Sequence, residues 1–108
     1  MKKLLALLLI NFAFICHAQG EMKFDELPFK ELIAKAKKEN KLVFIDAYAS
    51  WCGPCKMMER NIFPKKSVGD VYNKSFVNAR IDMEKGEGRE IAQKYGVRSY
   101  PTYLFLNG

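Results

Sequence analysis

The sequence has few of the side chains that usually bind metal ions or act as general bases. It contains three cysteines and one histidine in 108 residues, and the histidine, His17, directly follows Cys16 near the amino terminus. If the first 18 residues are removed, two cysteines and no histidine remain. Structural zinc sites need four ligands, so a zinc site here would lack two that Cys or His cannot supply. Histidine catalysis is excluded for such a chain.

The sequence also lacks an apolar run that could span a membrane, which takes roughly 20 apolar residues. Two lysines precede the apolar stretch Leu4–Ile15, which Asn11 interrupts and which gives way to the small residue Ala18. This order of charged, apolar and small residues is typical of a secretory signal peptide. We predict a signal peptide over residues 1–18, cleaved after Ala18, and a periplasmic or secreted location without membrane insertion. An uncleaved anchor and a lipoprotein acylated at Cys16 are the alternatives.

A run of like charge is missing as well. Removing residues 1–18 takes away two lysines and no acidic residue, which lowers the formal net charge from +6 to +4. The other basic residues are interspersed with acidic ones; Lys35, Lys37 and Lys38, for example, lie between Glu31 and Glu39. This mixture indicates a solvated helix face, so we expect no nucleic-acid partner.

What the chain does have is an alternation of helical and strand patterns over residues 19–108, which we interpret as one α/β domain. The expected strands span residues 22–24, 42–49, 76–82 and 101–106, and the expected helices span 28–39, 56–63, 67–73 and 89–95. The strands 42–49 and 76–82 should pair in parallel through a helical crossover. Asn107 and Gly108 are typical of a hairpin turn, so a returning strand is missing and we expect a truncated domain.

The two remaining cysteines, Cys52 and Cys55, lie where the strand 42–49 gives way to a helix. A thiolate at a helix start is stabilised by unpaired backbone N–H groups and by the helix dipole, which predicts Cys52 as a nucleophile. Cys55, one turn further in and more enclosed, would resolve the mixed disulfide. Gly53 and Pro54 keep the linker small, and Pro54 has the φ angle that a first helical turn requires.

Two other interpretations of the cysteine pair remain open. One is half of a zinc site. The other is an inert structural disulfide, although a bridge that closes so short a loop constrains the unfolded chain little.

Several ordered motifs now add to the cysteine pair: Asp46, Trp51-Cys52-Gly53-Pro54-Cys55-Lys56, Tyr95-Gly96-Val97-Arg98 and Tyr100-Pro101-Thr102. Through them the chain resembles the thioredoxin superfamily over residues 24–108, including its secreted branch and the soluble domain of membrane thiol:disulfide reductases. The resemblance implies a thioredoxin-like fold, with a central mixed sheet flanked by helices, whose C-terminal strand and helix are missing here.

The resemblance also implies roles for individual residues. Asp46 matches the buried aspartate that relays a proton to or from the resolving thiol, and Pro101 matches a cis-proline facing the cysteines. The backbone of Tyr100 would pair with an extended substrate, and Trp51, Gly53 and Pro54 would also contact it. Asp46 as a hydrogen-bonded strand residue and Pro101 as a trans proline are the alternatives.

The expected activity is that of a thiol-disulfide oxidoreductase without a cofactor other than its own Cys52–Cys55 disulfide. Gly53-Pro54 resembles reducing members of the superfamily, whereas oxidases and isomerases usually carry a histidine next to the second cysteine. We therefore expect a monomeric protein-disulfide reductase that acts on protein thiol or disulfide substrates. It would take electrons from an upstream donor such as a membrane thiol reductase. The alternative is a peptide-binding or chaperone-like module with a non-catalytic disulfide.

Overall fold

The structure is a computed structural model that describes residues 20–108, so the expected signal peptide lies outside the described residues. Helices and strands alternate along this part of the chain. In order they are α1 (Phe29–Glu39), β1 (Leu42–Tyr48), α2 (Gly53–Asn61), α3 (Lys66–Ser75), β2 (Phe76–Asp82), α4 (Gly88–Tyr95) and β3 (Thr102–Leu106). None of the helices in this range is long and apolar enough to cross a bilayer.

The three strands form one mixed sheet in the order β2-β1-β3. β1 pairs with β2 in parallel, with Asp46 opposite Arg80, and with β3 in antiparallel orientation, with Asp46 opposite Tyr103. The helices α2 and α3 make the crossover from β1 to β2. The predicted α/β class, the mixed sheet and the parallel pair are therefore confirmed.

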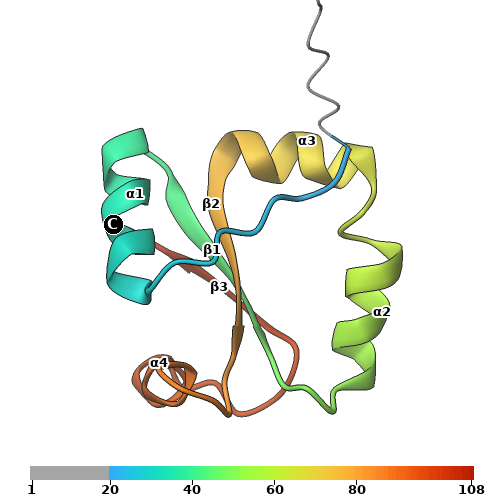
Figure 1. Cartoon of the computed structure of the whole chain (residues 1–108), viewed down its shortest axis with the longest axis vertical. Helices are drawn as coiled ribbons and strands as arrows, with labels where there is room; N and C mark the ends of the chain where they lie inside the picture. Colours follow the sequence, from blue (N-terminus) through green and yellow to red (C-terminus); the bar gives the residue numbers. More distant parts are fainter. Residues whose placement is uncertain (1–19) are drawn as a thin grey trace, which may run out of the picture.

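Side chains of the central strand alternate between two apolar layers, as the pleat of a strand requires. Val43, Ile45 and Ala47 pack with residues of α1 and α4, among them Leu32 and Ile91. Phe44, on the other face, packs with Phe63 and with partly buried residues of α2 and α3. Figure 1 shows α1 and α4 on one side of the sheet and α2 and α3 on the other.

The expected strand at residues 22–24 is not formed, and this prediction was wrong. The segment 20–28 is extended but makes only one backbone hydrogen bond with the sheet, from Asp25 N to Asn78 O (2.8 Å), so no ladder exists. Its partner is instead the side chain of Asn73 on α3. The Asn73 amide accepts from Lys23 N (2.8 Å) and donates to Glu21 O (2.9 Å), as a strand neighbour would.

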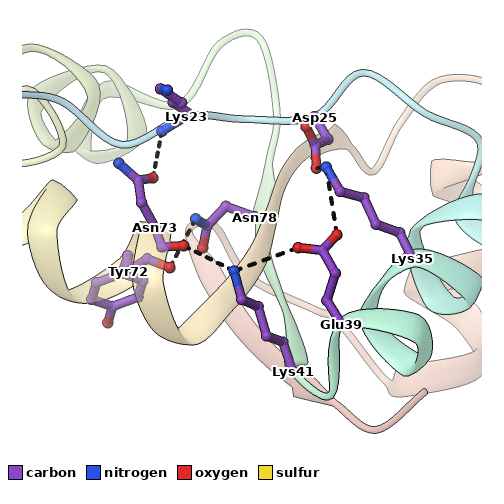
Figure 2. Close-up of polar contacts among 8 residues, drawn as sticks. All are labelled: Lys23, Asp25, Lys35, Glu39, Lys41, Tyr72, Asn73 and Asn78. Atoms are coloured by element: carbon purple, nitrogen blue, oxygen red, sulfur yellow. Dashed lines mark hydrogen bonds and ion pairs between the residues drawn. The ribbon is translucent and has the colours of Figure 1, made fainter. Parts of the chain in front are cut away.

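Figure 2 shows the polar cluster around this contact. The ammonium group of Lys35 lies 2.7 Å from Asp25 and 4.0 Å from Glu39, and Lys41 lies 3.5 Å from Glu39. Lys41 also donates to the backbone oxygen of Asn73 at the end of α3. The cluster thus joins the N-terminal segment, α1 and α3 at the end of the sheet where β1 and β2 begin.

Several element ends differ slightly from expectation. Pro28 is the residue before α1 rather than part of it, and it has no side-chain donor or acceptor to cap the helix. The carboxylate of Glu87 supplies the cap instead, accepting a 3.0 Å hydrogen bond from Phe29 N. α2 ends at Asn61, three residues before Pro64, and Gly96 ends α4 with a positive φ of 66°, as predicted.

Candidate dithiol active site

Cys52 and Cys55 form a disulfide at the amino-terminal end of α2. Cys52 is the residue that precedes the helix, and its sulfur accepts a 3.1 Å hydrogen bond from the backbone N–H of Cys55. Gly53 and Pro54 form the first helical positions, where a missing N–H leaves no hydrogen bond unmade. The structure therefore places the Cys52 sulfur where unpaired N–H groups of a helix start favour a negative charge.

The two cysteines are equally buried in this disulfide form, each with 2% of its surface exposed. Both belong to one cluster with Ala49, against which Tyr48 and Tyr100 pack, so their exposure in the disulfide form does not test the expectation that Cys55 is the more enclosed. What distinguishes the cysteines is their place on the helix. Only Cys52 has a sulfur that accepts a backbone hydrogen bond at the helix start.

Aromatic residues flank the disulfide on its open side. Trp51 is 67% exposed and meets the ring of Tyr100 edge to face, with ring centroids 5.7 Å apart. Its indole Nε1 donates a 2.7 Å hydrogen bond to Glu84, which lies just after β2. The predicted substrate residues Trp51 and Tyr100 are thus brought together beside the cysteines.

The Tyr100–Pro101 peptide bond is cis, as the resemblance implied. The cis geometry lies directly before β3, whose first residue, Thr102, donates from its hydroxyl to Ser99 O. Tyr100 packs against the cysteine cluster, so the backbone around Pro101 lies next to the disulfide rather than at a distant turn.

Asp46 is 1% exposed and lies on the face of β1 that α2 and α3 cover. Its Oδ2 atom accepts a 3.1 Å hydrogen bond from Nε of Arg80, while Oδ1 is buried and has no partner within residues 20–108. Burial raises the pKa of Asp46 above its ordinary value, Arg80 opposes this increase, and the negative charge of Glu59 adds to it. A buried carboxyl with a raised pKa is suited to exchanging a proton near neutral pH.

Three residues near this site were not singled out from the sequence: Arg80, Glu59 and Glu84. Arg80 lies on the same face of β2 as Phe76, Asn78 and Asp82, next to the apolar residues Ala79 and Ile81. A charged residue at an inward position of a strand needs a buried partner. That signal could have linked Arg80 to Asp46. Glu59 and Glu84 occupy exposed positions and carried no such signal.

Within residues 20–108, no group of three or more His, Cys, Asp or Glu side chains is placed to hold a metal ion. In this part of the chain, no further metal-ligating side chains therefore lie beside Cys52 and Cys55 to complete a zinc site.

Comparison with known proteins places this geometry in context. The thioredoxin-like family matches residues 28–108. Thioredoxin-1 of Drosophila melanogaster is 44% identical over 68 residues, which are 63% of this chain and 59% of that protein. A thioredoxin H-type of Oryza sativa subsp. indica is 37% identical over 93 residues, 84% of this chain and 64% of that protein. The chain thus spans less than two thirds of the length of these relatives.

Solved structures are similar as well. A Bacteroides thetaiotaomicron protein assigned as a disulphide isomerase is 48% identical, with a TM-score of 0.71 over 80% of this chain and 71% of that chain. A thioredoxin from Thermus thermophilus is 25% identical, with a TM-score of 0.69 over 79% of this chain and 64% of that chain. The three-stranded sheet and its helices therefore match the corresponding part of both structures.

Proposed function

This chain belongs to the thioredoxin-like family, and we propose that it is a thiol-disulfide oxidoreductase that reduces protein disulfides with Cys52 and Cys55. The observation that carries the proposal is the Cys52 sulfur at the start of α2, bonded to Cys55 in a disulfide and accepting the N–H of Cys55. In the reduced protein the same N–H group and the helix dipole stabilise the Cys52 thiolate.

The reaction has two exchange steps. The Cys52 thiolate attacks one sulfur of a substrate disulfide, forms a mixed disulfide and releases the other substrate sulfur as a thiolate. Cys55 then loses its proton and attacks the Cys52 sulfur, which forms the Cys52–Cys55 disulfide and releases the second substrate thiolate. Two electrons pass to the substrate, and a dithiol donor must return two electrons to the protein. We propose that the Asp46 carboxylate accepts the Cys55 proton.

Substrate binding is proposed for the surface next to the disulfide. An extended segment would lie beside cis-Pro101 and pair with the backbone of Tyr100, as one strand pairs with another. The exposed indole of Trp51 and the small residues Gly53 and Pro54 would form the remaining contacts. The side chains there are aromatic or small, which suits recognition of backbone rather than of one particular sequence.

The direction of electron flow is proposed from the linker between the cysteines. Gly53 and Pro54 carry no charge that would stabilise the reduced thiolate strongly, so the potential should lie near the reducing end, about −270 mV, rather than near −120 mV. A periplasmic or secreted location, a monomeric state and a membrane thiol reductase as donor complete the proposal.

Redox titration with thiol alkylation and mass measurement tests this function. We expect a reversible two-electron couple at the reducing end, and we expect Cys55→Ser to accumulate a mixed disulfide with a peptide disulfide. Cys52→Ser is the matched control and should trap none. A folded protein whose cysteine pair never exchanges would refute the catalytic proposal and leave a peptide-binding module with an inert bridge.

A further inference from the structure

Arg80 is held from three sides next to the buried Asp46. Its Nε atom donates to Asp46 Oδ2 (3.1 Å), and its Nη1 atom lies 3.1 Å from Oε1 of Glu59 on α2. Its guanidinium carbon lies 4.5 Å from the ring centroid of Tyr48, which is two residues from Asp46 on β1 and on the same strand face. An arginine fixed by two carboxylates and an aromatic ring has little freedom to turn.

The N–H donors of Arg80 are shared between Asp46 and Glu59, and this sharing determines which oxygen of Asp46 accepts a hydrogen bond. A guanidinium group often grips a carboxylate with two parallel N–H donors. Here the contact of Nη1 with Glu59 fixes the orientation of the guanidinium group, and in that orientation Nε alone donates to Asp46, through Oδ2. The other oxygen, Oδ1, is buried and has no hydrogen-bond partner among the described residues. A carboxylate with one free oxygen can take up a proton there while its other oxygen keeps the hydrogen bond from Arg80.

Charged and titratable groups face Asp46 from every element around it. Arg80 comes from β2, Glu59 from α2 and Tyr103 from β3, where it is the antiparallel register partner of Asp46. Cys55 lies in the first turn of α2, the helix that covers this face. Glu21 of the N-terminal segment lines the same hollow as Glu59 and Arg80. Arg80 lowers the pKa of Asp46, whereas burial and Glu59 raise it.

We infer that Glu59 is a positioning residue, which holds Arg80 on one oxygen of Asp46 and so keeps the other oxygen available for the proton of the resolving cysteine. The inference rests on the proposed function, because it assigns Asp46 the Cys55 proton. In that step the S–H bond of Cys55 breaks, the O–H bond forms at Oδ1, and the sulfur keeps the electron pair with which it attacks Cys52. Glu59 touches neither substrate nor sulfur and acts through Arg80.

Two variants should change the titration of Asp46 in opposite directions. Glu59→Gln removes a nearby negative charge and releases the guanidinium group of Arg80, which can then turn so that Nη2 joins Nε on Asp46. Both effects favour the carboxylate, so the titration midpoint falls. Arg80→Met leaves the buried carboxyl without its cation, so the midpoint rises. If Glu59 and Arg80 only stabilised the fold, both variants would lower the free energy of unfolding. The titration midpoint of Asp46 would then not shift in opposite directions.

The experiment is a carbon-13 NMR titration of the Asp46 carboxyl in the oxidised protein, combined with the pH profile of the resolving step. Glu90→Gln on α4 is the matched control, since it removes the same charge on the opposite side of the sheet. We expect the midpoint and the acid limb of the profile to move to lower pH in Glu59→Gln. Glu59→Asp, which keeps the negative charge, should leave the midpoint and the acid limb close to the wild-type values.

A Glu59→Gln midpoint equal to that of Glu90→Gln, or one that rises, would overturn the inference. If Arg80→Met does not fold, the comparison of Glu59→Gln with Glu59→Asp still tests whether Glu59 acts on Asp46. The carboxyl titration needs no activity. A protein whose cysteines exchange with nothing would therefore refute the proposed function, while the titration would still report whether Glu59 acts on Asp46 through Arg80.

Discussion

The indole Nε1 of Trp51 donates a 2.7 Å hydrogen bond to Oε1 of Glu84, which ties the most exposed aromatic side chain next to the disulfide to the loop after β2. The backbone of Glu84 is itself held, because its N–H donates to Asp82 Oδ1 (2.9 Å) and its carbonyl oxygen accepts from Arg89 Nε (2.8 Å). The orientation of the indole over Tyr100 is therefore fixed by a loop from another part of the chain.

Removing the Glu84 carboxylate should release Trp51. We expect Glu84→Ala to slow exchange with a peptide disulfide by roughly fivefold, the equivalent of the about 1 kcal/mol that a typical hydrogen bond contributes. Trp51 is the single tryptophan of the sequence, so its fluorescence anisotropy measures its mobility directly. Glu84→Gln keeps an acceptor and should behave like the wild type. Unchanged anisotropy in Glu84→Ala would show that the hydrogen bond does not position the indole.

Asp46 should make the protein less stable as pH rises. Its folded pKa lies above the ordinary value of 3.8, mainly because of burial, so the folded state keeps a proton that the unfolded state has already lost. Stability is then full below the ordinary value and decreases as pH rises through the raised one. Asp46→Asn should remove this decrease, so that its free energy of unfolding relative to the wild type is more favourable at pH 7 than at pH 3.5. Urea unfolding between pH 3.5 and 8 measures it.

The control for that series is Glu26→Gln, which removes a carboxylate from an exposed loop position. Its stability should follow the wild-type pH dependence. If Asp46→Asn also followed it, the buried carboxyl would not be a source of the pH dependence.

Asn73 should hold the N-terminal segment. Its amide makes hydrogen bonds of 2.8 and 2.9 Å to Lys23 N and Glu21 O, and Asn73→Ala loses both. Because water can replace them at this exposed site, we expect a cost of about 1 kcal/mol and faster amide exchange at Lys23. Lys74→Ala, at the neighbouring exposed position, is the control. If amide exchange at Lys23 is equally slow in both variants, the Asn73 side chain does not hold the N-terminal segment.

Gly88 should not tolerate any side chain. A Cβ atom there would overlap the backbone oxygen of Asp82, so the β2–α4 connection would have to move. We expect Gly88→Ala to lose about 3 kcal/mol or more of stability, or to fail to fold. Gly53→Ala meets no atom within 4 Å and should leave thermal stability nearly unchanged. Equal melting temperatures for the two variants would refute the steric argument.

The sequence predicted the elements that carry a strong local pattern. The continuous apolar run 42–45 indicated the central strand, Gly96 indicated the end of α4, and the motif around Cys52 indicated a strand-to-helix junction. All three are present. The segment 22–24 alternates apolar and charged residues as a strand would, but Lys23 N donates to an asparagine side chain 50 residues away, which no local pattern can indicate.

The site was predictable only in part, for a similar reason. Cys52, Asp46 and Pro101 stand in motifs, so their positions could be read along the chain. The groups that act on them come from elsewhere. Arg80 reaches Asp46 across two paired strands, and Glu84 reaches Trp51 across 33 residues. Such contacts depend on the register of the sheet and on loop geometry, which become known only with the fold.

The loop between β2 and α4 has one further physical consequence. Glu84 binds the indole beside the disulfide, and Glu87, three residues later, caps the start of α1 through Phe29 N. The backbone between these carboxylates is a spacer of fixed length between two fixed points. An inserted or deleted residue there would leave at most one of the two contacts in place. The length of this loop is thus constrained independently of the residues that compose it.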